Sequence, residues 1–299
     1  MKPNRCVCQI MLISALSFVC SLSLAANTAK PAAPVDDWKG TNFNTAHSAS
    51  VATEKPFDPT VHEAMTPAGS VCSEQLNAAI YRQDMLHAFE SNAHYDNCAF
   101  ETTYEYIQSM LKQSDAHFRR APDNWNDKTT VPQPILDGML ALGQILHSVQ
   151  DFYAHSNYVE LIQKINPVPE REQDIPVMIN WTKEGHTKIQ DYIKKGLVSG
   201  RVWWTFPHHC ANTGPTHADL AKDSATTNAG AKLSVWKRAA GNEKQKNYNV
   251  AYNLAHRGTR EFLQWSGEQW PQIEKHCGKT LKYIITEDKR QADLPETSP

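Results

Sequence analysis

The sequence has no excess of positive charge, no stretch of alternating apolar and polar residues, and no internal repeat. Its 30 Lys and Arg residues stand against 32 Asp and Glu, a formal net charge of −2 at pH 7. Without a basic surplus, the chain lacks the electrostatic footprint of a protein that binds nucleic acid or anionic membranes. Without strand-like alternation, a β-sheet protein is not expected. Hydrophobic residues make up 40% of the chain, enough for a sizeable core, so we predict an all-α protein with one helical domain.

A secretory signal is expected at the N-terminus. Lys2 and Arg5 precede an apolar run over residues 7–24, and small residues follow it. This pattern predicts cleavage after Ala25 or Ala26; the alternative is an uncleaved anchor, because the run is long enough to span a bilayer. Cleavage would remove two basic residues and no acidic ones, leaving 28 against 32, or a net charge of −4. No other stretch resembles a transmembrane helix, so we predict an exported protein, periplasmic or secreted.

Export determines how the cysteines are interpreted. Removal of residues 1–26 leaves four of the seven cysteines, Cys72, Cys98, Cys210 and Cys277. Four cysteines in an oxidising compartment most often form two disulfides. Three pairings are possible, and we predict Cys72–Cys98 with Cys210–Cys277. A zinc site with cysteine ligands is the weaker interpretation, because the chain has no Cys-x-x-Cys pair in this region.

The helical domain is expected to cover residues 61–286. Residues 27–60 are rich in Ala, Pro, Thr, Asn and Ser without periodicity, which predicts a flexible leader, and the charged tail 287–299 is expected to be disordered. The irregular stretch 197–227 is long for a compact domain, which is typical of a functional or pinned loop, and Cys210 offers the pin. Apolar residues at helical spacing predict helices over residues 73–90, 99–120, 137–164, 183–195, 245–265 and 272–285.

The long central helix, 137–164, carries the chemistry. His147, Asp151 and His155 follow one another at intervals of four, which places them within roughly 80° on one side of an α-helix. A single His on an apolar face is more often a hydrogen-bonded core residue. A carboxylate between two histidines is harder to explain in that way, because an unpaired buried carboxylate costs several kcal/mol. Bound to Zn²⁺ or another divalent cation, the three groups would be neutralised together, so we predict a metal site.

The stretch His147-Ser-Val-Gln-Asp151-Phe-Tyr-Ala-His155-Ser-Asn157 resembles the signature of the heterokaryon-incompatibility Het-C family. Segments 62–66, 93–97 and 221–224 resemble further elements of that family in the same order. The family is similar to the helical zinc-dependent phospholipases C and single-strand nucleases, which hold up to three zinc ions between helices and cleave phosphodiesters. The resemblance implies zinc, or another divalent metal, bound by His62, His94, His147, Asp151, His155 and His256.

The chain departs from those enzymes at two points. They use the amino group of an N-terminal Trp as a ligand, whereas the predicted mature terminus carries no Trp and lies well before His62. Their last ligand pair is His-x-x-x-Glu, but Arg260 stands four residues after His256. Glu261 is about 140° away from His256 on a helix, so the two should not share a metal. We therefore expect one or two ions rather than the full set of three.

The general base implied by the resemblance is a carboxylate beside the metal, either Asp84 or Asp96. It would take the proton of a water whose pKa the metal lowers. Asp223 is either a further ligand or an acceptor that orders its loop. His208 and His209 have no partners at ligand spacing and are expected on the surface.

Three functions remain open on the sequence. The first is an exported metal-dependent phosphodiester hydrolase acting on phospholipids, with a membrane surface as its partner. The second is a single-strand nuclease, which the acidic charge disfavours although bases could stack on Trp203 or Trp204. The third is a non-catalytic, metal-stabilised interaction or toxin protein. Trp203, Trp204 and Phe206 could line a lipid or base pocket, whereas clustered aromatic residues more often belong to a core.

Overall fold

A computed structural model describes residues 59–67, 69–125, 127, 129–237 and 242–278 of the chain. The predicted signal peptide, the predicted leader up to residue 58 and the predicted tail lie outside these residues. Residues 59 and 60, predicted to end the leader, instead begin the first helix.

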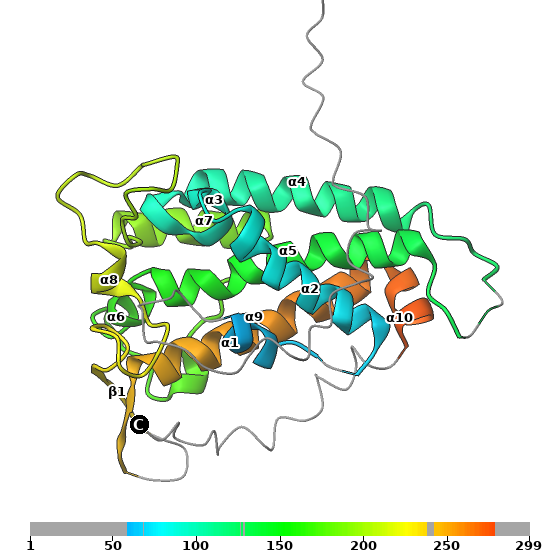
Figure 1. Cartoon of the computed structure of the whole chain (residues 1–299). Coiled ribbons are helices and arrows are strands. Elements are labelled where there is room, and N and C mark those ends of the chain that lie inside the picture. The colour runs from blue at the N-terminus through cyan, green and yellow to red at the C-terminus, as the bar shows by residue number, and fades with distance from the viewer. Residues whose placement is uncertain (1–58, 68, 126, 128, 238–241, 279–299) are drawn as a thin grey trace, which may run out of the picture. The chain divides into compact units, whose positions relative to one another are not determined.

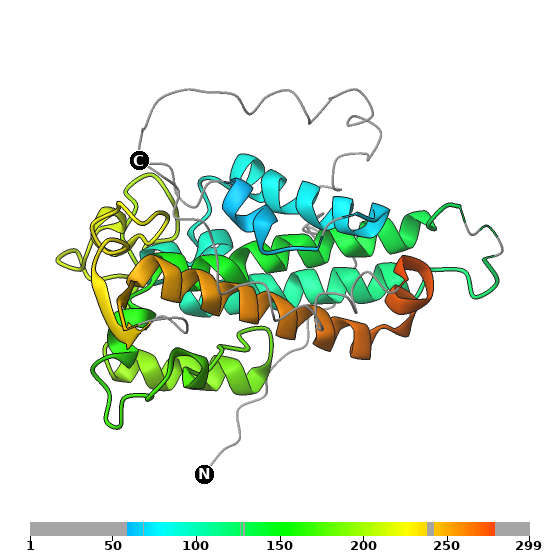
Figure 2. The ribbon, with the colours of Figure 1, turned by 90° about the horizontal axis from the view of Figure 1, so that it is seen from below.

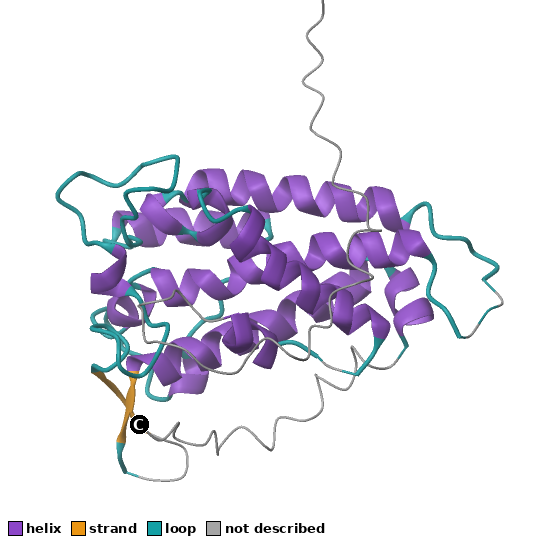
Figure 3. Cartoon of the chain, viewed as in Figure 1, coloured by secondary structure: helices purple, strands orange, loops and turns teal. Residues whose placement is uncertain are grey.

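The described chain is predominantly helical, which confirms the predicted all-α class (Figures 1 and 3). Two short strands form a hairpin, and two 3₁₀ turns, η2 and η3, lie between helices. In chain order the elements are α1 (Pro59–Ala64), α2 (Val71–Leu86), α3 (Ser91–His94), η2 (Asp96–Cys98), α4 (Phe100–Phe118), α5 (Gln133–His155), α6 (Tyr158–Ile162), η3 (Glu172–Asp174), α7 (Lys183–Lys194), α8 (His217–Leu220), β1 (Leu233–Lys237), β2 (Lys244–Lys246), α9 (Asn247–Gln269) and α10 (Pro271–Cys277).

The hairpin of β1 and β2 was not indicated by the sequence. The strands pair antiparallel, with Leu233 opposite Lys246. In β1 the buried positions are Ser234 and Trp236, while Leu233 and Val235 are exposed. Because two of its apolar residues face outward, the strand shows no apolar–polar alternation that would identify it.

Helix α5 is the central element of the fold. It packs against α2, α4 and α9, which lie around it in both ribbon views (Figures 1 and 2). Residues 141–155 are buried except for the half-buried Gln144, because neighbouring helices cover several sides of α5. Its polar side chains therefore lie in the core and need partners there. No helix within the described ranges combines the length and the apolar character needed to cross a bilayer.

The close approach of α2 to α5 depends on Gly143. A Cβ atom at this position would lie 2.5 Å from the Leu76 carbonyl oxygen and 2.6 Å from the Ala79 Cβ. Both distances are too short for carbon, and the first contact is with backbone. A side chain here would therefore push α2 away from α5.

The observed helix α5 ends earlier than the predicted helix 137–164. Helix α5 ends at His155, and Ser156 is extended (φ −97°, ψ 164°). The Asn157 backbone N–H donates to the Val198 carbonyl at 3.0 Å, and the Asn157 side-chain oxygen accepts from the Val198 N–H at 2.9 Å. These bonds to the segment after α7 replace the helical bonds, so the Asn166–Pro167 step does not set the end of the helix.

The four cysteines form two disulfides, as predicted, but the predicted pairing was wrong. The structure joins Cys72 to Cys277 and Cys98 to Cys210. Cys72 lies in the first turn of α2 and Cys277 ends α10, and the two helix ends meet at one end of the bundle (Figure 1). Cys98 ends η2 and faces the loop after α7. The expectation that Cys210 pins the irregular stretch 197–227 is confirmed.

Candidate metal centre

Histidine and aspartate side chains from six segments converge on one side of α5. The first three segments along the chain are α1, α2 and α3, which contribute one residue each; η2, α5 and the α8 region contribute the rest. The residues brought together are His62, Asp84, His94, Asp96, His147, Asp151, His155, His217 and Asp223.

Four donor atoms form the tightest group in this centre. Asp151 Oδ2 lies 2.9 Å from both His94 Nδ1 and His147 Nε2, and these two nitrogens are 3.0 Å apart. Asp84 Oδ1 lies 3.4 Å from His147 Nε2 and 4.0 Å from His94 Nδ1. Ligands at about 2.0–2.1 Å from a tetrahedral zinc ion are about 3.3 Å from one another. The three closest atoms, on His94, His147 and Asp151, could therefore share one zinc ion, and Asp84 would lie beside its fourth position.

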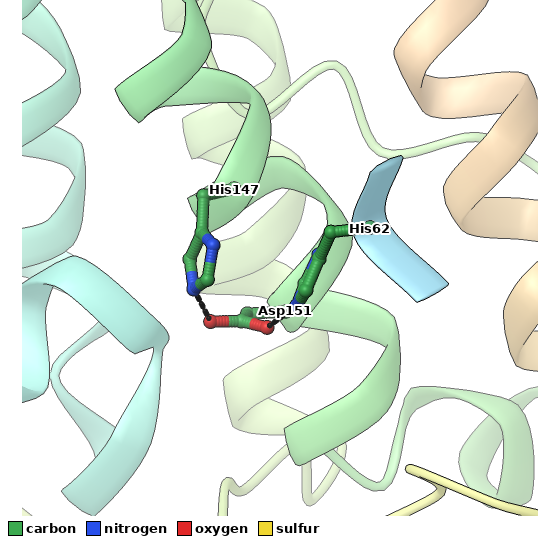
Figure 4. Close-up of side chains that lie close together, drawn as sticks. All are labelled: His62, His147 and Asp151. Atoms are coloured by element: carbon green, nitrogen blue, oxygen red, sulfur yellow. Dashed lines mark ion pairs between the residues drawn. The ribbon is translucent and has the colours of Figure 1, made fainter. Parts of the chain in front are cut away.

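The second carboxylate oxygen of Asp151 faces different histidines. Oδ1 lies 3.3 Å from His62 Nε2 and 3.8 Å from His155 Nε2. Figure 4 shows His62 and His147 on either side of the Asp151 carboxylate, each directed at a different oxygen. Asp151 thus connects two groups of donors.

A third group of donors lies at the C-terminal end of α5. Asp96 Oδ1 is 3.5 Å from His155 Nδ1 and 3.2 Å from His217 Nδ1. Asp223 Oδ1 is 3.5 Å from His155 Nε2, and its Oδ2 is 3.5 Å from His217 Nε2. This geometry supports the interpretation that Asp223 is part of the site and does not only order its loop.

Hydrogen bonds on the far side of two rings orient the nitrogens that face the centre. His62 Nδ1 donates to Gln150 Oε1 at 2.6 Å, and the Gln150 amide nitrogen donates to Thr259 Oγ1 at 2.8 Å. His155 Nδ1 donates to the His94 carbonyl at 3.0 Å. In a neutral ring, Nε2 then carries the lone pair, as a metal ligand requires. Within the described residues, the buried atoms His155 Nε2 and Asp151 Oδ1 make no hydrogen bond.

An unusual backbone conformation places His94 and Asp96. Tyr95, Asn97 and Cys98 all have positive φ, between 54° and 57°. Such conformations cost free energy in non-glycine residues and persist only where other contacts hold them. The Asn97 side chain supplies such contacts, because its amide nitrogen donates to the Val202 carbonyl at 2.9 Å and to the Thr205 carbonyl at 3.1 Å. The Cys98–Cys210 disulfide ties down the end of the turn.

Burial and the opposite charges determine the electrostatics of the site. Burial lowers the pKa of His62 and His94, but their interactions with the nearby Asp151 carboxylate outweigh it, so both pKa values are raised. The pKa of His147 is lowered, because burial dominates there. Burial raises the pKa of Asp151, but His147 and His155 outweigh it, so the pKa lies well below its usual range.

The same balance holds in the third group. Burial lowers the pKa of His155, but Asp151 and Asp96 outweigh it and hold the pKa well above its usual range. The pKa of His217 is raised to about 9 against burial and repulsion from His155, through its bonds with Asp223 and Asp96. The carboxylates of the centre thus raise the pKa values of several imidazoles, which means that they favour positive charge beside them. Two divalent cations could supply it equally well, since they would balance the four carboxylates Asp84, Asp96, Asp151 and Asp223.

Other residues predicted from the sequence lie differently. His256 is on α9 and belongs to none of the three groups of described residues that could hold a metal. His208 and His209 are exposed, as expected. Trp203 and Trp204 are exposed rather than part of the core.

Sequence reasoning did not single out His217 or Gln150. His217 lies in the stretch 197–227 that its length had marked as functional, so a histidine there was a usable signal. Gln150 carried none, because a glutamine on a buried helix has many roles.

Comparison with known families gives a match over part of the chain. A family model described as the VWA7 N-terminal domain matches residues 68–170, about a third of the chain. No curated protein and no solved structure matches the sequence. The resemblance to the Het-C family and to zinc-dependent phospholipases C is therefore wrong as a family assignment. The matched residues run from just before α2 through α6 and include Asp84, His94 and the three site residues of α5, whereas His62, His217 and Asp223 lie outside them.

Proposed function

We propose that this protein is an exported, metal-dependent hydrolase of phosphodiesters. The observation that carries the proposal is the Asp151 carboxylate, one oxygen of which faces His94 and His147 while the other faces His62 and His155. A carboxylate that presents each oxygen to a separate set of imidazoles has the arrangement of a group that bridges two cations. The geometry supports a site for two cations, and phosphodiester hydrolysis is a reaction that such a pair of cations catalyses.

Zinc is the cation that these donors suit best, since imidazole nitrogen and carboxylate oxygen are both zinc ligands. When bound, a pair of such cations polarises a phosphoryl oxygen, activates a water and stabilises the leaving oxygen of a phosphodiester. The chain itself must hold the donors in place, accept the proton of the water and admit the substrate.

Asp84 is the better candidate for the general base. Its side chain is 23% exposed, whereas that of Asp96 is 7% exposed. Asp84 therefore borders both solvent and the His147 nitrogen, where an entering water must lose its proton. Asp96 is enclosed by His155 and His217, which favours a role in holding the third group of donors.

The test combines metal analysis with hydrolysis assays. Purified protein is assayed with zinc, manganese, magnesium or calcium on a chromogenic phosphodiester, phosphatidylcholine vesicles and a single-stranded oligonucleotide, with and without chelator. Asp84→Asn should keep its metal and its melting temperature while hydrolysis falls by about 10²–10⁴. The matched control is Asp191→Asn, an exposed aspartate on α7, which should change none of the three quantities. If the wild type hydrolyses no substrate with any of these cations, the proposal is wrong.

A non-catalytic, metal-stabilised protein is the second candidate. The specific observation in its favour is that the donors come from six segments, so a bound cation would hold the fold together. The same assays decide between the two candidates, because a structural site predicts bound metal and a chelator-sensitive melting temperature without hydrolysis. The two disulfides support export in either case, since such bonds persist in oxidising compartments.

A further inference from the structure

The loop between α7 and α8 presents aromatic side chains to solvent. Figure 1 shows this yellow-green loop extending beyond the ends of the neighbouring helices. Trp203 is 80% exposed, Trp204 48% and Phe206 62%, and Phe89, which follows α2, is 69% exposed. These four residues are called the aromatic surface below. Exposed apolar residues scattered singly are normal, but a cluster of large aromatic side chains marks an interaction site.

The backbone under the aromatic surface is firmly held. The Phe206 N–H donates to the Phe89 carbonyl at 2.9 Å, and the Ser91 N–H donates to the Phe206 carbonyl at 2.8 Å. The Cys98–Cys210 disulfide holds the far end of the loop. The aromatic rings are therefore presented by a braced loop, and their exposure does not result from a loose segment.

The aromatic surface is built on segments that are joined to those of the candidate metal centre. Asn97, whose side chain binds the carbonyls of Val202 and Thr205, lies next to the site residue Asp96. On α2, Asp84 is followed directly by the exposed residues Met85 and Leu86. The aromatic surface and the partly exposed Asp84 are thus built on neighbouring segments of the chain.

We propose that the aromatic surface docks this protein on the headgroup region of a phospholipid bilayer. The sequence Val-Trp-Trp-Thr-Phe-Pro over residues 202–207 has no charged side chain, so it can enter the interfacial region without desolvating an ion. Tryptophan is enriched at membrane–water interfaces, where one end of the ring is apolar and the other wet. The chain has a formal net charge of −2, so apolar insertion rather than attraction to anionic lipids supplies the binding. Zwitterionic phosphatidylcholine should therefore suffice.

The docking goes beyond hydrolysis and does not require it. It would bring the metal centre against a surface rich in phosphodiesters, the substrate class of the proposed function. Because binding and hydrolysis are measured separately, either can fail without the other.

The experiment measures binding of the purified full protein to phosphatidylcholine vesicles by co-sedimentation and by the blue shift of tryptophan fluorescence. The double variant Trp203→Ala/Trp204→Ala should partition at least tenfold more weakly, which is about 1.4 kcal/mol. The matched control is Trp125→Ala, an exposed tryptophan in the loop between α4 and α5, which should bind as the wild type does. Trp203→Phe should retain most of the binding. Because Trp203 is highly exposed, these changes should leave the melting temperature and the hydrolysis of a soluble chromogenic phosphodiester unchanged.

Three results would overturn the proposal. The first is a wild type that does not bind the vesicles. The second is a double variant that binds as tightly as the wild type. The third is a wild type that forms dimers in analytical ultracentrifugation while the double variant is monomeric and neither binds vesicles, which would assign the surface to a second copy of the chain.

Discussion

His94 Nδ1 and His147 Nε2 lie 3.0 Å apart, and each is 2.9 Å from the same oxygen, Asp151 Oδ2. Two imidazole nitrogens at this distance cannot both carry a proton without strong repulsion. A nitrogen without a proton would instead direct its lone pair at the negatively charged carboxylate oxygen. A cation shared by the three atoms removes the conflict, and that is the physical reason for regarding them as metal ligands rather than as core hydrogen bonds.

The first prediction removes the shared carboxylate. Asp151→Asn should lower the metal content by at least one equivalent, because the neutral amide binds zinc poorly and no longer balances the histidines. In the presence of metal, the variant should melt at a lower temperature than the wild type. A cation at about 100 times its dissociation constant stabilises the fold by about 2.7 kcal/mol, and the variant loses this stabilisation. Mass-spectrometric metal analysis and calorimetry check both results. Full metal content in this variant would place the metal elsewhere.

The second prediction concerns pH and the buried carboxyl of Glu172, which lies on η3 away from the metal centre. Its side chain accepts hydrogen bonds from Asn253, at 2.8 Å, and from Gln245. Burial raises the pKa of Glu172 above its ordinary value of 4.5, and these bonds only partly offset it. The folded state therefore binds this proton more tightly than the unfolded state, and the free energy of unfolding falls as pH rises from about 4.5 through the raised pKa.

Urea unfolding of wild type and Glu172→Gln across pH 4–7 isolates this contribution, because the other titrating groups cancel. The stability of the variant relative to wild type should increase with pH, by about 1.4 kcal/mol for each pKa unit of the shift. Glu184→Gln, an exposed glutamate on α7, should show a difference that stays constant with pH. A constant difference for Glu172→Gln as well would contradict the prediction.

The third prediction concerns the disulfides. Peptide mapping of the unreduced protein should recover Cys72 linked to Cys277 and Cys98 linked to Cys210. Cys98→Ser/Cys210→Ser should lower the free energy of unfolding by up to about 5 kcal/mol in the chain-entropy account, because this bond closes a long loop. Recovery of a Cys72–Cys98 peptide would show that the pairing is wrong.

The fourth prediction compares two glycines in helices. Gly143→Ala should destabilise the protein by about 1–3 kcal/mol, because the added methyl collides with the backbone of α2. Gly267→Ala is the control: nothing lies within 4 Å of its Cβ position in α9, so helix propensity should stabilise the protein by up to about 1 kcal/mol. Urea unfolding measures both changes. Equal effects at the two positions would mean that α2 and α5 do not approach closely at Gly143.

Much of the fold was predictable from local patterns. The apolar residues at helical spacing predicted α4, α5, α7 and α9 to within a few residues at most ends, because a helix that buries one face must repeat it about every 3.6 residues. The predicted helix ends were wrong where contacts with residues distant in the sequence determine the end of the helix. Helix α5 stops at His155 because Val198, after α7, binds the backbone N–H and the side-chain oxygen of Asn157, and no residue near the break signals this.

The candidate site was likewise predictable only in part. That His147, Asp151 and His155 share one face follows from their spacing alone, since a helix turns by about 100° per residue whatever surrounds it. Which side chains meet them does not follow from spacing. His217 reaches the centre because η2 and the braced loop bring α8 beside Asp96, and Cys72 pairs with Cys277 because the start of α2 lies beside the end of α10. Helix periodicity is a local property of the chain, whereas the packing of helices depends on contacts between distant residues, and only the tertiary structure determines those contacts.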